Sequence, residues 1–231
     1  KKFETVQRMC TRLTRLPSQT AFFLLKNCYA IPKFMYLIRT SAAFSETDLL
    51  NEIDTALRSA VQDVFNVTIL DDIWLKITLP VKLGGFGLQC ISDISTSAFI
   101  SSVVSVNKLT GQSTPDATYD KALDMWTNLV DETATAPSSS RQKDWTKHVY
   151  NVRRNTLLAN CNSLDVARIQ GCSSRGSGDW IDVLPSATLG LSLSNDEFRI
   201  AAGLRLGAPI TPLFPCICGT VCTPDANHAL I

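Results

Sequence analysis

The sequence predicts a mainly α-helical protein, with two helical parts joined by a Ser/Thr/Pro-rich linker and a short Cys/His segment after them. Three observations support this prediction. Apolar residues recur at intervals of three and four along most of the chain, which is the period of a helix. Residues 133–140 (TATAPSSS) interrupt that pattern with a helix-breaking composition. Near the end, Cys216, Cys218 and His228 are spaced like the ligands of a metal site.

The first helix is predicted over residues 3–16, and Pro17 ends it. Its apolar positions follow the helical period at Phe3, Val6, Met9, Cys10, Leu13 and Leu16. A second helix is predicted over residues 20–39, with Ser18 as its N-cap. Pro32 lies inside this run and is expected to kink or end it.

The clearest helix follows residues 45–48 (SETD), which are similar to a capping box with Asp in the Glu position. Behind them, one apolar stripe is formed by Leu49, Leu50, Ile53, Leu57, Ala60, Val61, Val64 and Phe65. A stripe of this kind is typical of a helix that packs one face against a core.

Further helices are predicted over residues 91–108, 141–159 and 195–206, with loops at 84–87 (GGFG) and 171–178 (GCSSRGSG). After the last helix, Pro209, Pro212 and Pro215 predict that no further regular structure forms. The predicted organisation has four regions: residues 1–108, a helical region; 109–140, a helix flanked by flexible linkers; 141–208, a helical connector; and 209–231, a truncated Cys/His segment.

The net charge of +1 conceals a strong asymmetry along the chain. Residues 1–40 carry a net charge of +7, residues 41–135 carry −8, and residues 136–231 carry +2. A polyanionic partner is therefore expected to meet the amino-terminal segment. There, Arg8, Arg12 and Arg15 fall on one helix face and are the predicted phosphate contacts, with Lys26 and Lys33 behind them. The alternative is an ordinary solvated helix face.

The eight cysteines divide into scattered residues and one cluster. Cys10, Cys28, Cys90 and Cys161 are scattered among helical stretches and are expected to be small buried hydrophobes. Cys216, Cys218 and His228 supply three of the four ligands of a structural zinc site, and Cys222 is a candidate for the fourth. The alternative is that the fourth ligand lies beyond Ile231, which would leave the zinc site incomplete in this chain. Clustering with a His favours metal over disulfides, and so an intracellular compartment, nuclear or cytoplasmic.

Three other patterns were weighed as catalytic or binding sites. Asp71-Asp72 invites a polymerase interpretation, but Ile69 stands where a reverse-transcriptase box has an aromatic, so a helix N-cap is favoured. The GGFG loop has neither Gly-Lys-Ser/Thr nor GxGxxG around it, and a tight turn that needs positive φ is favoured. His148 has no nucleophile motif beside it. The sequence therefore predicts no catalytic residue.

Several short motifs together are similar to the region that follows the polymerase core in non-LTR retrotransposon reverse transcriptases. Leu79-Pro80 with the GGFG loop resembles the "LP…GGxGL" block of these proteins, and residues 24–28 and 36–40 resemble their thumb. Residues 178–180, 184–185 and 204–207 resemble the connector before the zinc knuckle. Cys216, Cys218, Asp225 and His228 resemble the knuckle itself, although Asn227 stands where the family often has Gly.

The resemblance implies a thumb-like region over residues 1–108, a connector and the start of a zinc knuckle, with the palm upstream and a nuclease downstream. It implies a fragment that is not itself an enzyme and that positions primer–template or target nucleic acid by backbone contacts. The expected partners are an RNA–DNA or DNA duplex and the rest of the parent polyprotein, with no membrane. The alternative function is a helical protein-interaction module, a host-retained remnant that does not bind nucleic acid.

Overall fold

The computed structural model describes residues 2–111, 116–130, 134–225 and 228. Its elements are helices, single turns and one short hairpin: α1 (Lys2–Leu13), α2 (Ser18–Leu24), η1 (Leu25–Tyr29), α3 (Ile31–Thr40), η2 (Ala43–Ser45), α4 (Thr47–Phe65), α5 (Asp71–Thr78), η3 (Val81–Leu83), α6 (Ile91–Thr110), α7 (Ala117–Leu129), α8 (Gln142–Asn160), α9 (Ser163–Cys172), α10 (Asp179–Asp182), α11 (Asn195–Leu206), β1 (Phe214–Pro215) and β2 (Val221–Cys222). The prediction of a mainly α-helical chain that ends in a Cys/His cluster is confirmed.

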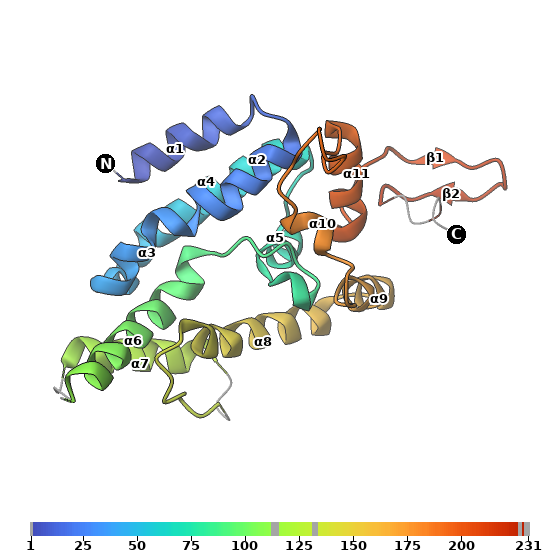
Figure 1. Cartoon of the computed structure of the whole chain (residues 1–231). Helices are drawn as coiled ribbons and strands as arrows, with labels where there is room; N and C mark the ends of the chain where they lie inside the picture. The colour runs from blue at the N-terminus through green and yellow to red at the C-terminus, as the bar shows by residue number, and fades with distance from the viewer. Residues whose placement is uncertain (1, 112–115, 131–133, 226–227, 229–231) are drawn as a thin grey trace.

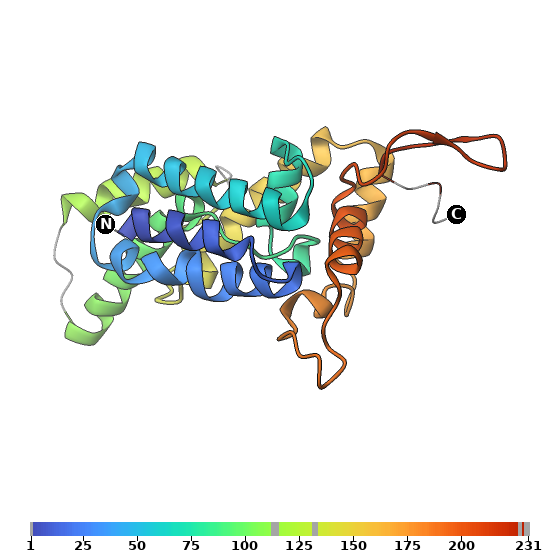
Figure 2. The ribbon, with the colours of Figure 1, turned by 90° about the horizontal axis from the view of Figure 1, so that it is seen from above.

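The helices form one body from which the β1–β2 hairpin projects. In Figure 1, α1, α3 and α4 lie together on one side, and α6, α7 and α8 form a second group below them. Figure 2 shows α1 lying along α4 and the α2–α3 segment, with the hairpin extending away from the body beyond α11. Helix α6 joins the two groups, because it contacts α3 and α4 as well as α7 and α8.

The start of the chain differs in detail from the expectation. Helix α1 ends at Leu13, so Arg15 lies in the turn after it. The predicted helix over 20–39 is three elements, because the π-helical turn η1 separates α2 from α3. Pro32 does not kink a continuous helix but lies in the first turn of α3. Proline is tolerated there because the first amides of a helix have no partner within it.

Helix α4 has the predicted apolar face, but its predicted cap is wrong. The N-cap is Glu46, no side chain bonds the first amides, and Ser45 belongs to the preceding 3-10 turn. Asp71 and Asp72 are likewise not caps, because Leu70 is the N-cap and both acids lie in the first turn of α5. Acidic residues are favourable in a first turn because they face the positive end of the helix dipole.

The core of the body consists of separate clusters of buried apolar residues, and these clusters cross the predicted region boundaries. Its largest cluster extends from Val6 in α1 to Ala208 beyond α11. In its centre, the rings of Phe22, Phe65, Phe86 and Phe198 pack with centroids 5.1 to 6.1 Å apart. A second cluster joins Phe99 of α6 with Trp126 of α7 and Trp145 of α8. The predicted divisions at 108 and 140 are therefore not packing boundaries.

The GGFG loop is the tight turn that the sequence predicts. Gly84 and Gly87 have φ of +94° and +72°, values that glycine adopts without strain. A Cβ on Gly85 would lie 2.0 Å from the Leu79 carbonyl oxygen, so only glycine fits. The loop carries the buried Phe86 ring into the core, and the buried Arg205 side chain of α11 donates to the Gly85 carbonyl at 3.1 Å. The loop is thus a packing element that joins α11 to the body.

Candidate metal centre

The hairpin that carries the cysteines forms although prolines flank and enter it, so the expectation of no regular structure after Leu206 is wrong. Phe214 pairs with Cys222 and Pro215 with Val221 in an antiparallel arrangement. The turn is closed by the Cys216 amide, which donates to the Thr220 carbonyl at 2.8 Å, and by the Gly219 amide, which donates to the Cys216 carbonyl at 2.9 Å. Pro215 is tolerated because a two-stranded ribbon consists of edge strands.

This turn brings the predicted metal ligands together. The ligand atoms of Cys216, Cys218 and His228 all lie within 4.8 Å of one another. Cys218 Sγ lies 3.1 Å from His228 Nε2. Gly219 has φ of +86°, which gives the sharp bend immediately after the second cysteine. These three residues could therefore hold a metal ion.

The turn also stabilises Cys218 as a thiolate, which is the form that binds metal. The hydroxyl and the backbone N–H of Thr220 are the main cause, and Cys216 and His228 add to it. Together they lower the pKa of the Cys218 thiol to about 6. A sulfur that already carries charge near neutral pH is suited to receive a cation.

The fourth ligand is not supplied by Cys222 in this conformation. Cys222 is buried on β2, and its sulfur does not belong to the group formed by the three ligand atoms. Burial raises the pKa of the Cys222 thiol, and the neighbouring Cys216 and Cys218 raise it further. Cys222 is thus near the site but is held as a neutral thiol. Asn227, which departs from the family pattern, lies outside the described residues.

A chain of charged side chains that the sequence analysis missed fixes the base of the hairpin to the body. Arg168 of α9 contacts Asp225 at 2.8 Å and also pairs with Asp165. Asp165 in turn accepts from the buried Lys76 of α5 at 3.1 Å. The Ile210 amide donates to the Pro224 carbonyl at 2.8 Å and closes the base of the hairpin. Asp165 and Arg168 are only three residues apart in α9, but Lys76 and Asp225 lie 89 and 57 positions from their partners, and no local pattern predicts those two contacts.

The predicted phosphate contacts fall into two groups. Arg8, Arg12 and Arg15 are exposed, and none of the three forms an ion pair with any residue that the structure describes. Lys26, in contrast, contacts Asp182 at 2.5 Å, and its side chain is only 12% exposed. Lys33 lies over the Tyr29 ring, 5.8 Å from its centroid. The structure therefore leaves the Arg residues open to a ligand and commits Lys26 to a partner within the chain.

The remaining candidates have structural roles. Asp71 contacts Arg58 at 2.7 Å, and Asp72 lies 3.8 Å from Lys76, so each carboxylate faces a cation of the chain. The His148 ring packs against the Trp126 ring at 5.7 Å. Each of these side chains therefore has a contact within the chain.

Comparisons of the chain with protein-family models, with curated proteins and with solved structures gave no match. Among the helices that the structure describes, none is long and apolar enough to cross a membrane. A proposal for function therefore rests on two features, the group of Cys216, Cys218 and His228 and the exposed Arg8, Arg12 and Arg15.

Proposed function

We propose that this chain is a non-catalytic module that binds the sugar–phosphate backbone of a nucleic-acid duplex through α1 and the turn that follows it. The observation that carries the proposal is the exposed row of Arg8, Arg12 and Arg15, whose guanidinium groups lack ion-pair partners in the described part of the chain. Guanidinium groups bind phosphate with two parallel hydrogen bonds, and such contacts position a duplex without reading its sequence. The resemblance to the thumb of non-LTR retrotransposon reverse transcriptases supports the same role.

The second part of the proposal is that the hairpin holds zinc in a structural role. Two thiolates and one imidazole form a donor set that suits zinc and does not suit magnesium or calcium, which prefer oxygen. With three ligands from the chain, a fourth position remains for Cys222 after a local rearrangement, or for a group outside the described residues. Zinc would hold the turn between β1 and β2 against the segment that carries His228.

A protein-interaction module remains the second candidate, and the hairpin favours it. Residues 206–231 contain no Lys or Arg. On the hairpin, Leu213, Ile217 and Val221 are apolar and at least 60% exposed. Zinc bound by two thiolates and a neutral imidazole has no net charge, so metal would not make this arm attractive to phosphate. If the chain binds a duplex, α1 and not the hairpin supplies the charge.

The test is duplex binding as a function of salt. Reversing three charges with Arg8→Glu, Arg12→Glu and Arg15→Glu should weaken binding to an RNA–DNA hybrid at least about tenfold at low salt. It should also reduce the slope of log K against log salt by about two to three, as expected for three lost phosphate contacts. The measurement is fluorescence anisotropy with a labelled hybrid and, in parallel, a DNA duplex.

The matched control reverses three exposed lysines elsewhere, with Lys121→Glu, Lys143→Glu and Lys147→Glu. Both triple variants change the net charge equally, so a loss confined to the Arg variant locates the contact on α1. Equal losses of duplex affinity in both variants would show that binding depends on the net charge of the chain and not on a contact at these arginines. Failure of the folded chain to bind either duplex at low salt would favour the protein-interaction module.

A further inference from the structure

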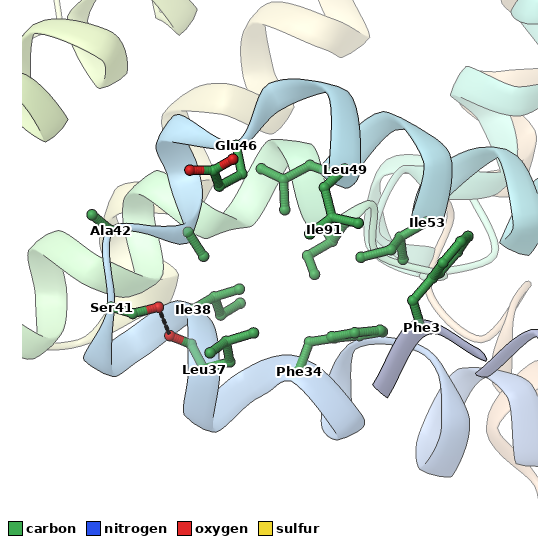
Figure 3. Close-up of a pocket in the computed structure, with 12 residues that line it drawn as sticks. Phe3, Phe34, Leu37, Ile38, Ser41, Ala42, Glu46, Leu49, Ile53 and Ile91 are labelled. Atoms are coloured by element: carbon green, nitrogen blue, oxygen red, sulfur yellow. Dashed lines mark hydrogen bonds between the residues drawn. The ribbon is translucent and has the colours of Figure 1, made fainter. Parts of the chain in front are cut away.

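A groove between α3 and α4 remains open where α1 begins. It encloses a cavity of about 510 Å³. As Figure 3 shows, apolar side chains of both helices converge on the cavity, with Phe34, Leu37 and Ile38 from α3, Leu49 and Ile53 from α4, and Phe3 of α1 at one end. The Ser41 hydroxyl at the other end already donates to the Leu37 carbonyl at 2.8 Å. Water in this cavity therefore meets walls that offer few hydrogen bonds.

Two of the wall residues are more exposed than large apolar side chains usually are in a helical core. Leu37 is 38% exposed and Leu49 is 43% exposed, and they come from the two helices that bound the groove. An occupant that covers both would remove apolar surface from water on each side of the cavity, which favours binding.

Helix α1 shows what kind of occupant this groove accepts. It lies along α4 and η1 and buries Val6, Cys10 and Leu13 there. These residues and Phe3 are spaced by three, four and three positions, which is the pattern of one face of an amphipathic helix. Phe3 is the first residue of that face and lines the cavity. The open part of the groove is thus continuous with a surface that already packs a helix.

The charges beside the groove indicate the polar face of the occupant. Glu46 lies at the mouth of the cavity, and Asp48 and Glu52 line an adjoining hollow next to α1. All three are exposed, and none of them forms an ion pair within the described ranges of the chain. A helix with Lys or Arg beside its apolar face would complement these carboxylates.

We propose that this groove binds a basic, amphipathic helix of a protein partner, seated end to end with α1. The partner's apolar side chains, spaced by three and four residues, enter the cavity between Leu37 and Leu49. Its basic side chains face Glu46 and Asp48. The binding mode is a helix in a groove, in which a few apolar anchors carry most of the affinity.

The test uses a labelled peptide of about 15 residues, a length near the minimum for an isolated helix in water. It carries Leu at positions i, i+3 and i+7 and Lys beside them. Saturable binding to the full chain, measured by anisotropy, should weaken at least about tenfold with Leu37→Gln plus Leu49→Gln. Both residues are partly exposed, so these substitutions leave the core intact. Glu46→Lys should weaken binding by a smaller factor, and a peptide with Gln in place of Leu should not bind.

A second measurement separates a partner helix from a segment in the same chain. Two helical turns are fused before Lys1, with Leu four and seven residues before Phe3, and the control fusion has Gln at both positions. If the Leu fusion raises Tm above the control while the free peptide fails to bind, the partner is wrong and the groove takes a helix only from its own chain. Peptide binding that the Leu37 and Leu49 substitutions leave unchanged would overturn the site itself.

Discussion

The helical body and the metal hairpin depend on different forces. The body is held by apolar clusters, and in the largest of them Leu57, Phe65 and Phe86 are fully buried. In the hairpin, Cys222 is buried, but Ile217 at the turn is fully exposed and Phe214 is 40% exposed. Burial of apolar surface can therefore stabilise the body, whereas the hairpin buries little of its apolar surface. We therefore expect the body to fold without metal, and we expect a metal ion bound by Cys216, Cys218 and His228 to stabilise the hairpin.

The largest effect should come from the core. Phe65→Ala removes a ring that lies 5.1 Å from both Phe22 and Phe86, and it leaves a cavity that the packed neighbours cannot fill. We expect a loss of about 3–5 kcal/mol in the free energy of unfolding. Urea denaturation of the metal-free chain, followed by circular dichroism, measures it.

Replacing a phenylalanine of the hairpin with alanine is the control for Phe65→Ala. Phe214→Ala should change the free energy of unfolding by no more than about 0.5 kcal/mol, because this side chain is 40% exposed. Similar losses in the two variants would contradict the division between a packed body and a hairpin that depends on metal.

The next largest effect concerns zinc itself. Cys218→Ser removes the thiolate nearest to His228 and should weaken zinc binding at least about 100-fold, measured by competition with a chromophoric chelator. Cys28→Ser is the matched control, because Cys28 is an exposed thiol of η1 in the body and not the buried residue that the sequence predicted. The metal-free Cys218→Ser chain should unfold at the Tm of the parent. A body that unfolds cooperatively when zinc is removed would show that the two regions are not independent.

The sequence predicted what local patterns determine. The bounds of the helix over 195–206 were predicted correctly. The stripe predicted on α4 is buried from Leu50 to Phe65, but Leu49, which was predicted to belong to it, is 43% exposed. Helix α9 was missed, although Asn162 caps it by accepting from the Asp165 amide, because its composition has no clear apolar stripe. In this case a capping signal was present and no periodic signal supported it.

For the candidate site residues, too, the sequence predicted what depends on local spacing and missed what depends on tertiary contacts. Cys216, Cys218 and His228 were predicted from spacing alone, since a short turn brings near neighbours together. The pairing of Lys26 with Asp182 joins residues 156 positions apart, and no local pattern predicts such a contact. It depends on the packing of α10 against the GGFG loop, where the Trp180 ring lies 5.9 Å from the Phe86 ring. Lys26 was therefore assigned to phosphate on its charge, whereas its tertiary surroundings give it a partner.

The smallest predicted effect is a pH response of the stability of the body, opposite in direction to the pH response expected for zinc binding by the hairpin. Burial raises the pKa of Asp93 to about 7, although Arg153 pairs with one carboxylate oxygen, and the other oxygen has no partner among the described residues. Between about pH 4 and pH 7 the folded protein therefore holds a proton that the unfolded chain has released. Raising the pH through this window favours the unfolded state.

We expect the body to lose on the order of 1–2 kcal/mol of stability as the pH rises from 4 to 7, less than the full shift implies because buried sites respond with a high effective dielectric. Asp93→Asn cannot ionise and should flatten this slope, measured by urea denaturation of the metal-free chain at several pH values. Asp144→Asn, at a carboxyl whose pKa the Ser139 hydroxyl and Arg141 lower, should not flatten it. Zinc affinity should instead rise with pH, because its ligands must lose protons to bind. A body whose stability rises with pH over the same window would show that Asp93 is ionised in the fold, with Arg153 outweighing its burial.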